Sequence, residues 1–185
     1  MNSAAVQAKL DLAAYLEWES GQPDKNEFVR GEVFAMVGPQ RVHGEIVRNL
    51  TVALHAHLKD TPCRSYSADM KVRVATADAV FYPDLFVTCD ARDLATDRVF
   101  EHPKLVIEVF PDSTGAYERG LKFAAYRQLP SLAEYALIAP ERKSVEVFRR
   151  NADDLFVLHD FTGQEAVEFQ SIGAKVPLAT LFENV

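Results

Sequence analysis

The chain has 185 residues, of which 48% are hydrophobic, and its 27 acidic and 20 basic side chains give a formal net charge of −7. This composition suits one globular domain with a core large enough to fold without disulfides, and it argues against disorder over most of the chain. The net negative charge also argues against a nucleic-acid coat protein or a nonspecific DNA binder. It does not argue against an enzyme that binds phosphate through a metal ion.

The first third of the chain predicts a helix, a hairpin and a second, longer helix. Residues 10–19 have the spacing of a short amphipathic helix, which stops at the Ser-Gly-Gln-Pro sequence of 20–23. Residues 27–36 resemble two strands that turn at Arg30-Gly31. From 43 to 59, apolar residues recur at helical spacing, so we expect this helix to pack one stripe on a sheet. The stripe consists of Ile46, Val47, Leu50, Leu54 and Leu58.

Strands then follow. Residues 70–74 alternate as a half-exposed strand, whereas 84–89 and 105–110 are apolar enough to be central strands that are buried on both faces. Thr114 is a plausible N-cap for a helix that continues to about Gln128. Three further strands are expected, at 135–138, 145–149 and 155–159.

This order of elements predicts an α/β or α+β layered fold, with a mixed central β-sheet flanked by helices. No repeat, low-complexity tract or linker divides the sequence. We therefore expect a single domain over residues 1–185, with its core at about 12–160.

The cysteines and the N-terminus predict a reduced setting. Cys63 and Cys89 are too few for a disulfide framework and lack the spacing of a zinc site or redox motif, and Cys89 ends an apolar segment as an expected buried thiol. Residues 1–9 show no secretory signal, and no window approaches the length of a membrane span. We expect a cytoplasmic protein without a membrane partner.

Two acids lie in segments that otherwise have the pattern of buried strands. Asp84 follows Pro83 at the head of one apolar run, and Glu108 lies inside the run from 105 to 110. A buried carboxylate is costly unless something compensates its charge. Lys122 follows on the next expected helix. Two acids and a lysine indicate a divalent metal ion and a reaction at phosphate, because Mg²⁺ prefers oxygen ligands and is usually held by one or two carboxylates.

Each of these residues also has a purely structural interpretation. Glu108 could pair with an arginine at a strand edge, and Pro-Asp is a common turn dipeptide. Glu118, Lys122 and Tyr126 share one helical stripe, so Lys122 could form an ordinary exposed pair with Glu118.

Two residues of the N-terminal half also have a structural and a functional interpretation. Glu27 could be a surface residue at the start of the hairpin. His43 could hydrogen-bond backbone at the start of its helix or take part in function, although its sequence context is not a metal motif.

A series of short motifs is spread along the chain. They are Glu27 to Glu32, His43 to Leu50, Tyr82-Pro83-Asp84, Ile107-Glu108-Val109, Ser113-Thr114, Arg119, Lys122, Tyr126 and Glu134-Tyr135. Together they resemble the Uma-two family of endonucleases, a branch of the PD-(D/E)XK nuclease superfamily, over nearly the whole sequence from about 12 to 148. The resemblance implies a restriction-endonuclease-like fold and the hydrolysis of phosphodiester bonds in DNA with Mg²⁺ or Mn²⁺.

The resemblance also implies roles for individual residues. Asp84 and Glu108 correspond to the metal-binding acids, and Glu27 corresponds to an additional acid from the N-terminal region. The superfamily usually places its lysine two residues after the second acid, where this chain has Phe110. Lys122 is therefore the expected catalytic lysine, beside Asp84 and Glu108, because a long side chain on a neighbouring helix can reach the same space. The superfamily frequently forms dimers, so a homodimer is an expected assembly.

Two departures from the family pattern leave other functions open. The loop after Glu108-Val109 contains Phe110, Pro111 and Asp112 in place of the usual Leu-Ser-Pro, and Glu118 stands where an aspartate often precedes the arginine. One alternative is a catalytically weak nucleic-acid-binding or scaffold protein that keeps the nuclease fold. The other is a small-molecule phosphodiesterase, since such a metal site does not specify a polymer.

Overall fold

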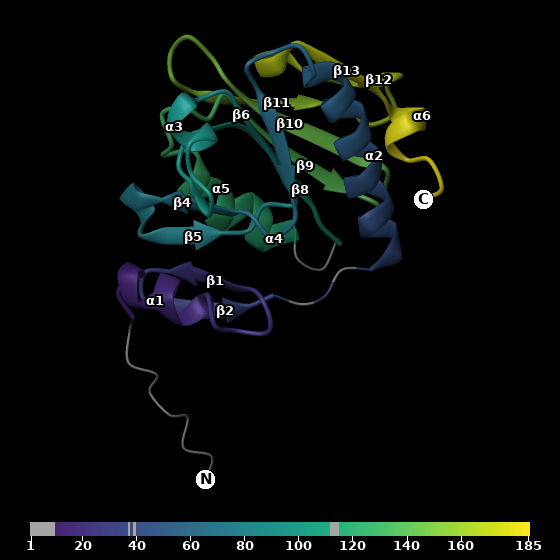
Figure 1. Cartoon of the computed structure of the whole chain (residues 1–185). Coiled ribbons are helices and arrows are strands. Elements are labelled where there is room, and N and C mark those ends of the chain that lie inside the picture. Colours follow the sequence, from purple (N-terminus) through teal and green to yellow (C-terminus); the bar gives the residue numbers. More distant parts are fainter. Residues whose placement is uncertain (1–9, 37, 39, 112–114) are drawn as a thin grey trace.

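Two mixed β-sheets form the body of the molecule in the computed structural model, which describes residues 10–36, 38, 40–111 and 115–185 (Figure 1). Within these residues, one sheet has the strand order β2 (Glu32–Ala35), β1 (Asn26–Val29), β5 (Ala79–Phe81), β4 (Lys71–Val74) and β7 (Val99–Phe100). The larger sheet has the order β11 (Phe156–Asp160), β10 (Ser144–Arg150), β9 (Glu134–Ala139), β8 (Pro103–Val109), β6 (Leu85–Thr88) and β3 (Arg64–Ser67). The pairs β8–β9 and β4–β7 are parallel, and the other neighbours are antiparallel.

Helices and a C-terminal hairpin cover these sheets. The α-helices are α1 (Leu12–Glu19), α2 (Arg41–Leu58), α3 (Ala91–Leu94), α4 (Gly115–Tyr117), α5 (Phe123–Tyr126) and α6 (Leu178–Leu181). A π-helical turn, η3 (Glu118–Lys122), joins α4 to α5, and short 3-10 turns occur at η1 (Ala75–Ala77) and η4 (Gln170–Ile172). The hairpin consists of β12 (Ala166–Phe169) and β13 (Ala174–Pro177).

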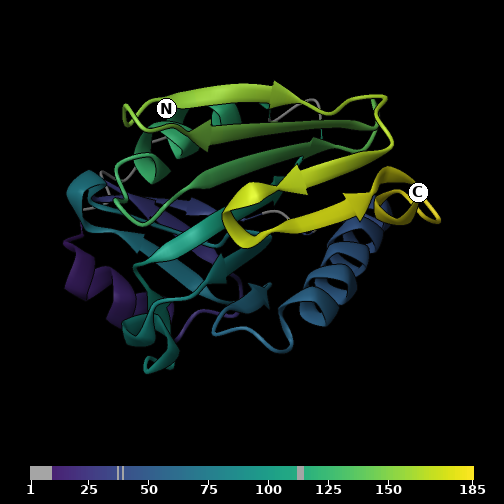
Figure 2. The same cartoon turned by 90° about the horizontal axis from the view of Figure 1, so that it is seen from above.

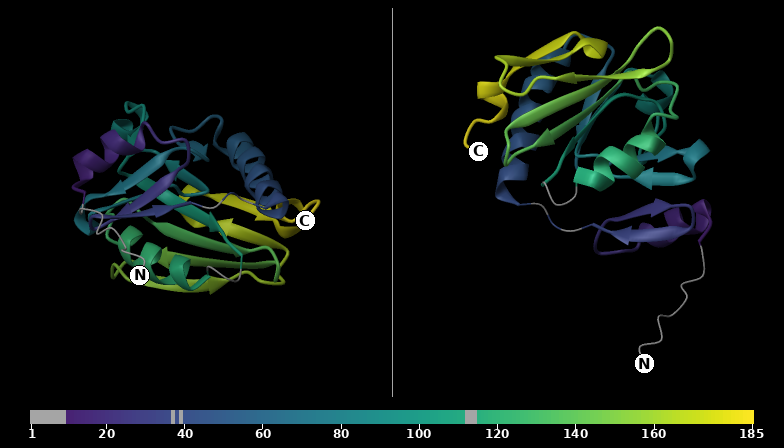
Figure 3. Two further views of the ribbon diagram at one scale, coloured as in Figure 1. Left: turned by 90° about the horizontal axis from the view of Figure 1, so that it is seen from below. Right: turned by 180° about the vertical axis from the view of Figure 1, so that it is seen from behind.

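The central strands of the larger sheet, β6, β8 and β9, are buried on both faces. Helix α2 packs its apolar stripe on one face, together with the β12–β13 hairpin and α6 (Figure 2). The other face packs against α5 and the smaller sheet through a second apolar cluster, which includes Phe81, Phe86 and Tyr126 (Figure 3). Helix α1 lies on the outer side of the smaller sheet, where Tyr15 stacks on Phe28 at 4.9 Å between ring centroids.

Several sequence predictions are confirmed in detail. The hairpin turns at Arg30 and Gly31, whose φ angles of 51° and 87° are the left-handed conformations that a tight two-residue turn requires. Strands β6 and β8 are neighbours inside the larger sheet, and their described residues are almost entirely buried. The mixed sheet with flanking helices is the expected fold class.

Other parts of the fold were not predicted. The strands β3, β5, β7, β12 and β13 are too short or too irregular in pattern to stand out from the sequence. The helix expected over 114–128 is interrupted by the π turn η3, and its expected N-cap, Thr114, lies outside the described residues. The packed core also includes residues after position 160, among them Val167, Phe169 and Leu181.

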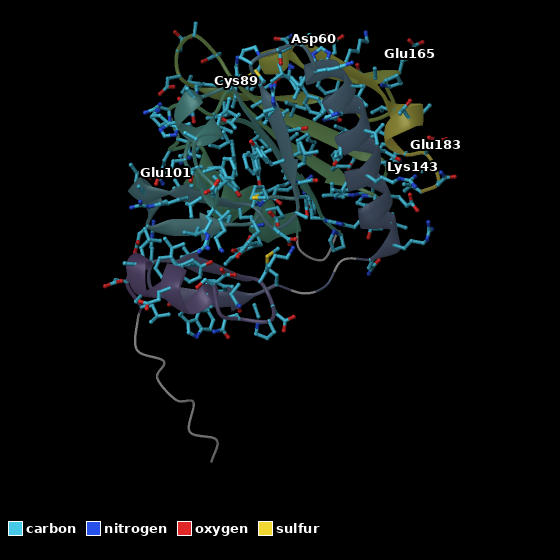
Figure 4. The ribbon with its side chains drawn as sticks, in the orientation of Figure 1. Asp60, Cys89, Glu101, Lys143, Glu165 and Glu183 are labelled. Atoms are coloured by element: carbon cyan, nitrogen blue, oxygen red, sulfur yellow. A yellow bond between two sulfur atoms is a disulfide. The ribbon has the colours of Figure 1, made fainter. Side chains whose placement is uncertain are left out.

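The cysteines correct one prediction. Cys63 and Cys89 form a disulfide rather than free thiols (Figure 4). Cys63 precedes β3 and Cys89 follows β6, and the antiparallel register that pairs Arg64 with Thr88 sets the two cysteines opposite each other, with Cα atoms 4.0 Å apart. The prediction of a buried thiol was wrong because strand pairing, not sequence spacing, brings the sulfurs together. Among the described residues, no helix is long and apolar enough to cross a membrane.

Candidate active site

Four elements bring the predicted acids and the lysine to the space between the two sheets. Glu27 lies on β1, where its neighbour Phe28 faces α1, so the alternation of the strand turns Glu27 inward. Asp84 lies in the connection from β5 to β6, which joins the two sheets. Glu108 lies on β8 and faces the same side as Val106 and Phe110, as the period of a strand predicts.

Lys122 ends the π turn and is surrounded by carboxylates. Its Nζ lies 2.9 Å from Oε1 of Glu27, 3.4 Å from Oε1 of Glu108 and 3.4 Å from Oε2 of Glu118. All four residues are buried, with 2% of Glu108 and 4% of Lys122 exposed. The ordinary interpretation of Lys122 as a surface partner of Glu118 is therefore wrong, because the pair lies inside the protein.

Glu118 and Lys122 lie at the two ends of the π turn. The backbone carbonyl of Glu118 accepts from the N–H of Phe123, five residues later, and also from the hydroxyl of Tyr135 at 3.1 Å. A π turn is wider than an α turn and occurs often at functional sites. Here both charged side chains of the turn enter the same buried cluster.

Asp84 is held at both carboxylate oxygens. The Nε2 atom of His43 lies 2.8 Å from Oδ1, and the backbone N–H of Val109 donates to Oδ2 at 2.7 Å. Because Val109 follows Glu108, this second bond ties Asp84 directly to the strand that carries the other acid. The Asp84 side chain is 19% exposed, which makes it the most accessible of the predicted site residues.

Glu27 is anchored by three donors. Besides Lys122, the backbone N–H of Tyr82 donates to Oε1 at 3.3 Å and the hydroxyl of Tyr117 donates to Oε2 at 3.2 Å. The interpretation of Glu27 as a surface residue is wrong, because only 4% of the residue is exposed.

The cluster carries more negative than positive charge. Burial raises the pKa of Glu108 well above its usual range, and Glu118, Asp84 and Glu27 raise it further, while Lys122 opposes them. Burial likewise raises the pKa of Glu118 to about 7. Burial acts to lower the pKa of Lys122, but the three glutamates outweigh it, so this pKa lies above its ordinary value and the amine is charged.

These residues fit a hard divalent cation by chemistry and by charge. Mg²⁺ takes carboxylate oxygens as ligands, and it is usually held by one or two of them together with water and substrate. Burial is the first cause of the raised pKa values of Glu108 and Glu118, and the neighbouring carboxylates raise them further, which Lys122 opposes. Within the described part of the chain, no three His, Cys, Asp or Glu side chains form a group that could hold a metal ion.

Several basic side chains that could otherwise have met a phosphate are paired with acids. Lys71 lies 2.6 Å from Glu19, and Arg119 lies 2.6 Å from Glu146. Arg48 and Arg73 are similarly paired. Their charge is largely balanced, which agrees with the acidic composition of the chain.

The structure therefore brings Glu27, Glu108 and Lys122 into contact and sets Asp84 beside them through Val109. It adds Glu118, which the sequence presented as an ordinary helical partner of Lys122, and His43, whose role the sequence left open. Tyr117 was not singled out at all, and no local pattern in the sequence marks its contact with Glu27.

The chain is similar to known proteins over most of its length. A family model described as "Putative restriction endonuclease", Uma2, matches residues 12–178. Two uncharacterized proteins of Synechocystis sp. are similar in sequence. One is 30% identical over 96% of this chain and 93% of its own length, and the other is 29% identical over 86% and 92%.

The fold is also shared with a solved structure. The crystal structure of a "putative nuclease belonging to DUF820" from Anabaena variabilis superposes with a TM-score of 0.77 and covers 94% of this chain and 97% of that one. At 17% sequence identity, this likeness concerns the fold.

Proposed function

Since the chain belongs to the Uma2 family, we propose that it is an endonuclease that hydrolyses phosphodiester bonds in DNA with the help of Mg²⁺ or Mn²⁺. One observation supports this proposal above all. The Lys122 ammonium contacts the carboxylates of Glu27 and Glu108, and Asp84 lies beside them at the junction of the two sheets.

In this proposal, Asp84 and Glu108 hold the metal ion, and Glu27 assists directly or through a water molecule. A divalent ion bound there would offset charge on the phosphoryl oxygens and lower the pKa of a bound water. A phosphate would reach the site at the partly exposed Asp84 carboxylate, because Glu27 and Glu108 are almost fully covered.

Lys122 contributes a positive charge that is held in one position. An ammonium that is desolvated among carboxylates is positioned before substrate arrives, so it can orient the attacking water and stabilise the charge of the transition state without reorganisation. The contact with Glu27 holds its Nζ in place.

The direct test is incubation of the purified protein with supercoiled and linear DNA in Mg²⁺, Mn²⁺ or EDTA. We expect cleavage that needs the metal and that falls at least about 100-fold in Asp84→Asn, Glu108→Gln and Lys122→Met. Glu168→Gln is the matched control, because it removes an exposed carboxylate paired with Lys175 at 3.1 Å outside the site.

Three results would contradict the proposal. Cleavage that survives every substitution indicates a contaminating nuclease. Binding of DNA without cleavage in any metal favours the scaffold function. Hydrolysis of bis(p-nitrophenyl) phosphate with DNA and RNA left intact favours a small-molecule phosphodiesterase.

A further inference from the structure

His43 contacts Asp84, one of the two proposed metal ligands. It lies in the first turn of α2, on the face of the larger sheet opposite α5, and its Nε2 reaches Oδ1 of Asp84 at 2.8 Å across 41 residues of sequence. The side chain of His43 is 21% exposed and that of Asp84 is 19% exposed, so both partners of this contact are partly accessible to solvent.

The bond has a defined direction. A carboxylate only accepts hydrogen bonds, so the proton of the contact belongs to Nε2 of His43. With the proton on Nδ1 instead, a nitrogen lone pair would face a carboxylate oxygen, and the Nδ1–H would be buried without an acceptor among the described residues. The geometry therefore assigns the Nε2–H form to the ring.

The two donors on Asp84 come from different elements, and together they fix the plane of the carboxylate. His43 holds Oδ1 from α2, and the Val109 backbone holds Oδ2 from β8. Each oxygen keeps further lone-pair directions for a ligand, since a carboxylate offers about four acceptor positions. Hydrogen bonds of this kind orient ligating carboxylates, and losing one typically costs 10–100-fold in metal affinity.

We propose that His43 is a positioning residue that orients the Asp84 carboxylate for a divalent cation. The proposal rests on the proposed function, because it takes Asp84 as a metal ligand. With His43, the site includes a residue of α2. The proposal requires a hydrogen-bond donor at the position of Nε2, and it does not require the imidazole ring itself.

Two amide variants test whether the hydrogen-bond donor must lie at the position of Nε2. In His43→Gln the side-chain amide ends near the place of Nε2 and can still donate to Asp84, whereas in His43→Asn the same amide ends near Nδ1 and is too short. We expect Mn²⁺ affinity, measured by calorimetry without DNA, to stay within about threefold of the wild type for His43→Gln and to fall about tenfold for His43→Asn. His57→Asn is the control on the same helix, since His57 contacts the Ile172 carbonyl instead.

A second measurement does not depend on metal. Imidazole ¹H–¹⁵N spectra of the wild type should show His43 protonated at Nε2, and this signal should shift in Asp84→Asn but not in Glu168→Gln. A ring protonated at Nδ1 alone would overturn the proposal, even if the variants differ in affinity.

The failures of the two proposals are distinguishable. If the wild type binds Mn²⁺ and Asp84→Asn weakens it while His43→Asn does not, the role of His43 is overturned and the metal site stands. If Asp84→Asn binds Mn²⁺ as the wild type does, or the wild type binds none, the proposed metal-dependent function fails and the role of His43 fails with it.

Discussion

At the scale of single residues, Lys122 compensates the charge of Glu27, Glu108 and Glu118 at once, with each carboxylate 2.9 to 3.4 Å from its Nζ. One positive charge cannot fully compensate three neighbouring carboxylates at low dielectric. The pKa values of Glu108 and Glu118 are raised first by burial and then by these neighbouring carboxylates. A cluster of this kind is stabilised by a bound cation or by acid.

Glu118 leads to a prediction on pH. Its pKa is about 7 in the folded protein, against 4.5 for an ordinary glutamate. The folded state therefore retains a proton that the unfolded chain releases between pH 4.5 and 7, so the stabilising contribution is fully present below 4.5 and is lost as the pH rises through 7. This loss is on the order of 3 kcal/mol. Urea unfolding between pH 5 and 8 should show a smaller loss of stability for Glu118→Gln than for the wild type.

Glu168→Gln is the control for this comparison, because Glu168 is exposed and lies outside the cluster. Its pH dependence should parallel that of the wild type. If Glu118→Gln also runs parallel to the wild type, the titration near 7 does not belong to Glu118.

At the scale of elements, the helix from α4 through η3 to α5 carries both Glu118 and Lys122 into the site. Its two glycines have opposite surroundings. A Cβ built on Gly115 would lie 2.9 Å from Cε2 of the buried Phe110 ring and 3.0 Å from Nη1 of Arg119, whereas a Cβ on Gly120 would meet nothing within 4 Å. Gly115 therefore allows the helix to approach β8 closely, and Gly120 has no such role.

This difference predicts opposite effects of the same substitution. Gly120→Ala should raise the free energy of unfolding by about 0.5–1 kcal/mol, because alanine has less freedom to lose on folding. Gly115→Ala should lower it by about 1–3 kcal/mol, because the Phe110 ring must shift in a packed core. Denaturant midpoints of both variants provide the test. Destabilisation by Gly120→Ala would mean that the π turn itself requires glycine at this position.

At the scale of the whole molecule, the disulfide ties the edge strand β3 to β6, the strand that follows Asp84. The two cysteines are 26 residues apart, and a cross-link over a loop of this length stabilises a fold by about 3 kcal/mol, mainly through the entropy of the unfolded chain. Dithiothreitol should therefore lower the urea midpoint of the wild type.

The double variant Cys63→Ser/Cys89→Ser separates loss of the cross-link from other effects of the reductant. Its midpoint should equal that of the reduced wild type and should not respond to dithiothreitol. Titration of free thiols in the unfolded, unreduced wild type should give none. Two free thiols per chain under these conditions would contradict the disulfide.

The amino-acid sequence was sufficient for features that depend on near neighbours. Helical spacing located α2, alternation and turn chemistry located the β1–β2 hairpin, and continuous apolar runs located β6 and β8. The period of a strand also predicted that Glu108 faces away from Leu105, Ile107 and Val109, which pack against α2. Together with the family resemblance, these local rules sufficed for the fold class and for the choice of the candidate acids and lysine.

Only the tertiary structure decided which side chains meet. Glu118 enters the site because its helix packs the stripe that carries Glu118 and Lys122 toward Glu27 and Glu108, and His43 reaches Asp84 because α2 lies against the sheet beside the start of β6. Cys63 and Cys89 bond because their strands pair. Each of these contacts depends on elements that lie apart in the chain. Local periodicity in the sequence does not predict such contacts, because they follow from how whole elements pack.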